Sequence, residues 1–114
     1  MKKIFLPLVL IANLTFGQVD LNLGLRAYYP FSGNANDVSG NNNNPVFNNA
    51  TLTADRFGNP NSAYNFNGTS SYMRIPNSAT LNTTNKLSLC AWVRPTGFYA
   101  GPCHGNAVIT KGNS

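Results

Sequence analysis

Short runs of apolar residues, separated by stretches rich in Asn, Gly and Pro, make up most of the chain after residue 22. Apolar and polar side chains alternate over residues 63–67, which is the pattern of a strand with one buried face. Residues 87–93 carry apolar bulk on both faces, as expected of an inner strand that is packed on both sides. No long helical periodicity is present in the sequence. We therefore predict an all-β fold.

Further strands are predicted for residues 23–31, 72–75 and 107–111, and for the two ends of the stretch 50–68. A turn is predicted at 58–61, where Gly, Asn and Pro follow one another. No internal repeat or linker divides the chain, so these short strands are expected to form one β-sandwich. We expect that sandwich to be incomplete, with only its first half present, because a second half is needed to cover the strand edges.

Residues 1–17 have the pattern of a secretory signal peptide. Lys2 and Lys3 precede an apolar stretch at 4–14, and small residues lie just before the expected cleavage point at Gln18. An uncleaved membrane anchor is the alternative, but the stretch is shorter than the roughly 20 residues of a spanning helix. Cleavage leaves 97 of the 114 residues and lowers the net charge from +5 to +3. We expect a secreted or cell-surface protein with no membrane span after signal removal.

The basic residues of the remaining chain are scattered singly, whereas nucleic-acid binding usually needs a clustered basic face. We therefore expect no nucleic-acid partner. The chain's only acidic residues are Asp20, Asp37 and Asp55. Most glycosidases need two carboxyl groups that face each other, and these three lie before the fold or in separate predicted loops. We predict that the residues present form no enzyme active site.

Cys90 and Cys103 are the two cysteines. In an oxidising compartment an even number of cysteines usually indicates a disulfide, and closing so short a loop contributes about 3 kcal/mol in the chain-entropy model. A zinc site is the rival hypothesis, but it needs about four ligands and only His104 is at hand. A thiol nucleophile with His104 as its base is disfavoured, because adjacent residues rarely orient in that way.

Four stretches resemble the laminin-G-like, concanavalin-A-like jelly-roll family of secreted bacterial proteins. They are "GLRAYYPFSGNANDVSGNNN", "ADRFGNPNSAYNFNGTSSYMRIPNS", "LSLCAWVRP" and "AVITKGNS", and they follow in the family's order. The resemblance implies an antiparallel two-sheet jelly-roll β-sandwich, with residues 18–114 as the N-terminal part of the domain. It also supports the Cys90–Cys103 pairing, which one variant of the family contains. Family members act mostly as binding or adhesion modules, often for glycans, and some bind calcium.

The Asn-rich tract at 34–44 has two interpretations. Asn and Asp readily form Asx turns, so the tract is explained by an ordered loop alone. The alternative is a calcium site, since calcium binds six to eight oxygen atoms. The family's "ND-x-SGN" pattern matches here, and the resemblance implies Asp37, Asn36, Ser39 and Asn41 as ligands. One carboxylate supports only a structural or weak site, and no organic cofactor is expected. The acidic pair of pentraxin-like relatives is absent at 68–72.

Exposed aromatic rings are the usual contacts for sugars. Phe98 and Tyr99, in a Gly-rich loop, are the candidate ligand-binding pair, with plain loop packing as the alternative. The core is expected to hold Tyr28, Tyr64, Phe66 and Trp92. We expect a secreted, non-catalytic binding or adhesion module whose partner is a glycan or another extracellular ligand. The alternatives are an accessory domain of a larger secreted glycoside hydrolase or protease, and a purely structural adhesin spacer.

Overall fold

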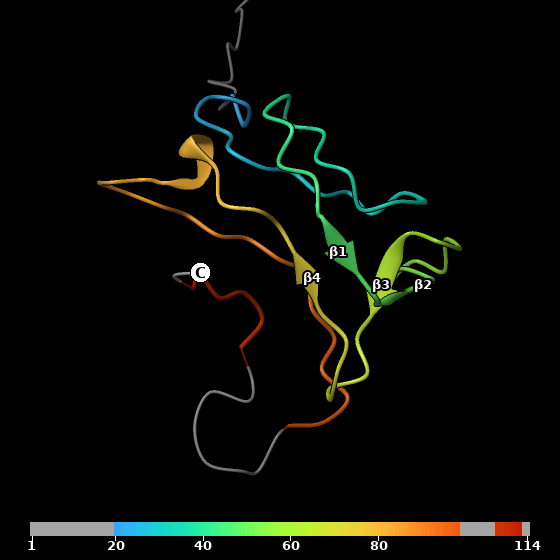
Figure 1. Cartoon of the computed structure of the whole chain (residues 1–114). Coiled ribbons are helices and arrows are strands. Elements are labelled where there is room, and N and C mark those ends of the chain that lie inside the picture. The colour runs from blue at the N-terminus through green and yellow to red at the C-terminus, as the bar shows by residue number, and fades with distance from the viewer. Residues whose placement is uncertain (1–19, 99–106, 113–114) are drawn as a thin grey trace, which may run out of the picture.

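The computed structural model describes residues 20–98 and 107–112 (Figure 1). Regular structure in these ranges consists of short strands and one 3-10 turn. The elements are β1 (Phe47–Asn48), β2 (Thr51–Thr53), β3 (Ala63–Asn65), β4 (Met73–Arg74) and η1 (Ala79–Leu81). Every strand pair is antiparallel. The described part of the chain is therefore β-rich and antiparallel, as the sequence predicts.

The strands form two small sheets, one nested inside the other along the chain. β1 pairs with β4, placing Phe47 opposite Arg74, and β2 pairs with β3, placing Leu52 opposite Tyr64. The bend between the two sheets is held by Asn49. Its side chain accepts a hydrogen bond from the Tyr72 backbone N–H at 2.8 Å and donates to the Ser70 carbonyl.

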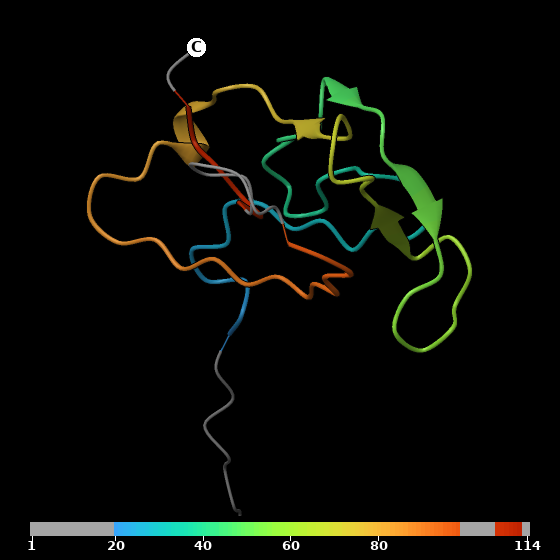
Figure 2. The same cartoon turned by 90° about the horizontal axis from the view of Figure 1, so that it is seen from below.

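The turn predicted at 58–61 is confirmed, and it lies in the loop that projects from the sheets in Figure 2. Gly58 and Asn61 both have positive φ angles, of 88° and 53°, which Gly and Asn adopt most readily. The Asp55 carboxylate fixes this loop, because it accepts hydrogen bonds from the Phe57 N–H and from the backbone and side chain of Asn59. The Asn59 side chain is the main reason that the pKa of Asp55 lies below its usual value.

The strand predictions are confirmed at β2, β3 and β4 and wrong in three other places. Residues 23–31, 87–93 and 107–111 contain no strand. A strand exists only where a neighbouring segment accepts and donates backbone hydrogen bonds, and the described residues supply no such neighbour to 87–93. In the case of 23–31, the backbone bonds instead to the Asn-rich tract, with the Val38 N–H donating to the Tyr28 carbonyl at 2.9 Å.

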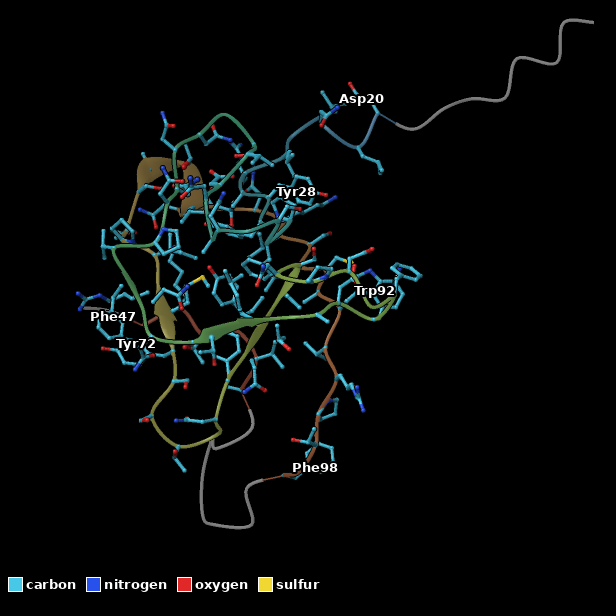
Figure 3. The ribbon with its side chains drawn as sticks, turned by 90° about the vertical axis from the view of Figure 1, so that its right-hand side faces the viewer. Asp20, Tyr28, Phe47, Tyr72, Trp92 and Phe98 are labelled. Carbon is cyan, nitrogen blue, oxygen red and sulfur yellow. The ribbon has the colours of Figure 1, made fainter. Side chains whose placement is uncertain are left out.

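The core prediction is also largely wrong. Tyr28, Phe66 and Trp92 are 53%, 46% and 82% exposed, and Tyr64 is half-buried, so none of the four is buried. Phe31 packs edge-on against Tyr64, with 5.1 Å between ring centroids. Phe47 stacks on Tyr72 at 4.6 Å, as the side chains in Figure 3 show. Such pairs cover one another without forming a buried interior.

Candidate functional site

The Asn-rich tract is an ordered loop built around one carboxylate, and we call residues 34–44 the Asp37 loop. One oxygen of Asp37 accepts hydrogen bonds from the backbone N–H groups of Tyr28 and Ser39, and the other accepts from the Asn43 N–H and the Ser39 hydroxyl. All four bonds are 2.9 Å long. The bond to the N–H two residues ahead is the Asx turn that Asp commonly forms. Asp37 is thereby 9% exposed.

Burial and hydrogen bonding act on Asp37 in opposite directions. Burial alone would raise the pKa of its carboxyl group, because it disfavours the charged form. The N–H donors of Tyr28, Ser39 and Asn43, with the Ser39 hydroxyl, outweigh burial and hold the pKa below its usual value. Asp37 is therefore an anion at neutral pH. Burial and the nearby Asp37 charge raise the pKa of Tyr29 to about 12, so its phenol stays a donor.

Asn43 is the most buried polar residue described, at 2% exposure. Its side-chain nitrogen donates to the Arg26 carbonyl at 2.8 Å, and its side-chain oxygen accepts from the hydroxyls of Ser78 and Thr80 at 2.6 and 3.1 Å. Its backbone carbonyl accepts from the Tyr29 hydroxyl at 2.6 Å. Asn43 thus joins the Asp37 loop both to η1 and to the segment that precedes the loop. No sequence signal separates Asn43 from the three asparagines around it.

Three of the four predicted calcium ligands come together. Ser39 and Asn41 lie beside Asp37, and the Asn41 side-chain nitrogen donates to the Ser39 hydroxyl at 3.2 Å. The same nitrogen donates to the carbonyls of Leu25 and Arg26 at 3.1 and 3.2 Å. The fourth predicted ligand lies apart: Asn36 is exposed, and its backbone N–H donates to Asn34.

The oxygen atoms around the Asn41 amide fit a calcium ion by their chemistry. The two backbone carbonyls are oxygen ligands that calcium prefers, and the Ser39 hydroxyl connects them to the Asp37 carboxylate, each oxygen of which an ion would share with two hydrogen-bond donors. Rotating the Asn41 amide by half a turn would present its oxygen among them in place of its nitrogen. Within the described ranges no group of three or more His, Cys, Asp or Glu residues forms a metal cluster. Any ion here would rely mainly on neutral oxygens.

The second group of predicted residues lies in the C-terminal part. Phe98 is 78% exposed, and Tyr99, its predicted partner, lies outside the described residues. Cys90 is exposed. Cys103 and His104 lie outside the described residues, so the Cys90–Cys103 disulfide stays a prediction.

Trp92 forms a site that the sequence did not indicate. The guanidinium carbon of Arg56 lies 3.8 Å from the centre of the Trp92 ring and 4.5 Å from the centre of the Phe57 ring. Both rings remain largely exposed, at 82% and 74%. Figure 3 shows Trp92 at the edge of the molecule. No pattern relates Arg56 to Trp92 in the sequence, because they are far apart along the chain.

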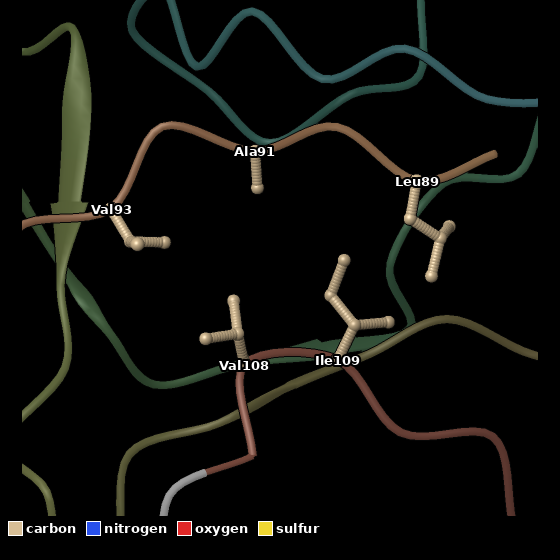
Figure 4. Close-up of a pocket in the computed structure, with 5 residues that line it drawn as sticks. All are labelled: Leu89, Ala91, Val93, Val108 and Ile109. Carbon is tan, nitrogen blue, oxygen red and sulfur yellow. The ribbon is translucent and has the colours of Figure 1, made fainter.

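An open groove of about 350 Å³ lies between the two C-terminal segments (Figure 4). Five aliphatic side chains line it: Leu89, Ala91, Val93, Val108 and Ile109. Among the described residues no helix is long and apolar enough to cross a membrane.

No protein-family model matches the sequence, and no curated protein or solved structure matches it either. The family resemblance of the four stretches is therefore a proposal.

Proposed function

We propose that this chain is a secreted, non-catalytic β-sandwich module of the laminin-G-like, concanavalin-A-like jelly-roll type that binds carbohydrate. The exposure of Trp92 and Phe98 is the observation that carries the proposal. An exposed ring offers apolar area that a ligand can cover, and a sugar presents an apolar face that stacks on such rings. Both rings belong to the segment that follows residue 86, so one extended glycan would contact them in turn.

The segment around these rings supports binding rather than packing. Leu87, Leu89 and Val93 are also more than half exposed. These exposed apolar residues contrast with residues 47–74, which contain the two strand pairs and in which Asn, Ser and Thr predominate. We therefore place the glycan surface on residues 87–98.

We propose calcium as a structural ligand of the Asp37 loop rather than as a direct ligand of the glycan. Asp37, Ser39 and Asn41 would hold it with the carbonyls of Leu25 and Arg26. A bound calcium ion supplies positive charge that a carboxylate and neutral oxygens share. The residues themselves fix the loop against the segment before it, with or without the ion.

A glycan array probed with the full chain tests the function. We expect binding to a subset of glycans, and a loss of up to roughly tenfold in affinity for both Trp92→Ala and Phe98→Ala, since stacking of a ring contributes about 0.5–1.5 kcal/mol. Phe66→Ala removes an exposed ring elsewhere and is the matched control. The array is run in calcium chloride and in EDTA, and thermal melting in the same two buffers reports calcium binding to the loop.

Failure to bind any glycan in either buffer would overturn the carbohydrate proposal and leave the spacer alternative. Binding that both ring variants retain would move the glycan surface away from residues 87–98. A melting temperature that calcium does not raise would remove the calcium proposal without touching the other.

A further inference from the structure

The Arg56 side chain contacts two exposed aromatic rings. It lies in the loop between β2 and β3 and reaches the Trp92 ring, which belongs to a distant segment. The guanidinium carbon lies over the Trp92 and Phe57 rings at cation–π distances of 3.8 and 4.5 Å. The Arg56 side chain is itself exposed, so its N–H donors are accessible to a ligand in solvent.

The described residues supply no anion for these donors. Asp55, the neighbouring acid, is committed to Phe57 and Asn59 within its own loop. Asp37 is enclosed by its four donors, and Asp20 accepts from the Asn22 N–H. These are the only acidic side chains in a chain of net charge +5. An anionic ligand at Arg56 would therefore meet no competing carboxylate from the described residues.

We propose that Arg56 and Trp92 form a subsite for a sugar that carries a carboxylate, such as a uronic acid within an acidic polysaccharide. This inference rests on the proposed carbohydrate function and names its ligand class. The exposed Trp92 ring offers a stacking surface for the sugar ring. The planar fork of Arg56 matches the two oxygens of a carboxylate, which it binds through two parallel hydrogen bonds.

Calorimetric titration of the full chain with an oligogalacturonide tests the subsite. The matched ligand is the same oligosaccharide with its carboxyl groups reduced to alcohols, which keeps the rings and removes the charge. We expect the carboxylated ligand to bind roughly tenfold tighter or more, since a hydrogen bond to a charged group contributes about 1.5–3 kcal/mol. Raising the salt concentration should weaken the carboxylated ligand alone.

Variants separate the subsite from general attraction. Arg56→Gln should lose roughly tenfold in affinity for the carboxylated ligand and leave the reduced ligand unchanged. Arg56→Lys keeps the charge but lacks the planar fork, so it should recover only part of the loss. Arg74→Gln removes an exposed arginine on β4 and is the matched control for net charge. Circular dichroism of each variant establishes that it keeps the wild-type fold.

The outcomes distinguish the acidic-sugar subsite from the carbohydrate function on which it rests. Equal affinity for the two ligands, with Trp92→Ala weakening both, would overturn the acidic-sugar subsite and keep the carbohydrate function. Equal losses of affinity for the carboxylated ligand in Arg56→Gln and Arg74→Gln would mean that net charge alone explains the preference, and would overturn the subsite. Tighter binding of a sulfated oligosaccharide than of the carboxylated one would also overturn it. No binding of either ligand, together with a blank glycan array, would overturn both proposals.

Discussion

The Asp37 loop and the segment 87–93 reverse the usual roles of polar and apolar residues. The loop is among the most polar stretches of the chain, yet it contains Asp37 and Asn43, the two buried polar residues described. The segment is among the most apolar, yet Leu89 and Trp92 are 64% and 82% exposed. Order in this molecule therefore follows hydrogen bonding more closely than hydrophobicity.

The difference shows what each region lacks. Residues 25–44 contain no strand, and side chains replace the missing ladder by bonding to backbone groups such as the Arg26 carbonyl and the Tyr28 N–H. Segment 87–93 consists mainly of Leu, Ala, Trp and Val. Such side chains cannot replace the missing hydrogen bonds of a strand ladder. Apolar side chains become ordered by packing on another surface, whereas polar side chains become ordered by hydrogen bonds to nearby backbone groups.

Removing the Asp37 charge should have the largest effect on stability. Asp37→Asn keeps the shape of the side chain but turns one acceptor oxygen into an N–H donor that faces other donors. We expect the free energy of unfolding to fall by about 2 kcal/mol, because buried donors lose their partner. Urea unfolding followed by circular dichroism measures the change.

Asp55→Asn is the matched control, since Asp55 also organises a loop but is fully solvated. A smaller loss in Asp55→Asn than in Asp37→Asn is expected. Equal losses would contradict the central role of the Asp37 loop.

Acidification should weaken the same loop. The folded-state pKa of Asp37 lies below the unfolded value of about 3.9. Its contribution to stability is therefore complete above that unfolded value and is lost as the pH falls through the folded-state pKa. Urea unfolding at a series of pH values from neutral to about 2 measures the loss. Asp37→Asn should show a shallower decline below about pH 4 than the wild type, and parallel declines would assign the acid sensitivity to other groups.

Changing the exposed segment should have the smallest effect. Leu89→Ser is expected to alter the free energy of unfolding by no more than about 0.5 kcal/mol, as exposed substitutions usually do. Phe47→Ala breaks the stack with Tyr72 and should cost about 1 kcal/mol more. The same urea titration measures both. A loss in Leu89→Ser that exceeds the loss in Phe47→Ala would mean that residues 87–93 are covered in solution.

The sequence predicted local features well, but it predicted poorly which distant segments contact one another. Alternation located β3, and turn chemistry located the loop at 58–61, because both depend on neighbouring residues. Asx turns were predicted for the Asn-rich tract, since an Asx turn is also local, whereas Asp37 was singled out only as a calcium ligand and its part in fixing the loop was not foreseen. The pattern at 87–93 predicted an inner strand packed on both faces, which was wrong because the pattern carries no information about a pairing neighbour. Pairing is a property of distant residues.

The candidate site divides in the same way. Ser39 and Asn41 follow Asp37 closely, so their place beside it was predictable, whereas Asn43 depends on Ser78 and Thr80. The stack of Arg56 on Trp92 joins a loop and a segment that no motif relates. Trp92 was assigned to the core because large aromatic residues usually bury much of their area, and that general tendency does not hold here.

Residues 47–74 contain the pair β2–β3 nested inside the pair β1–β4, and we call them the arm. The nesting has a consequence for the order in which the arm folds. Once the inner pair closes, the ends of β1 and β4 are already near each other, and the outer pair closes a much shorter effective loop. Asp55 and Gly58 shape the tip, where that closure begins. The arm should therefore zip from its tip toward its base, and a change in the Asp55 loop should slow folding more than it speeds unfolding.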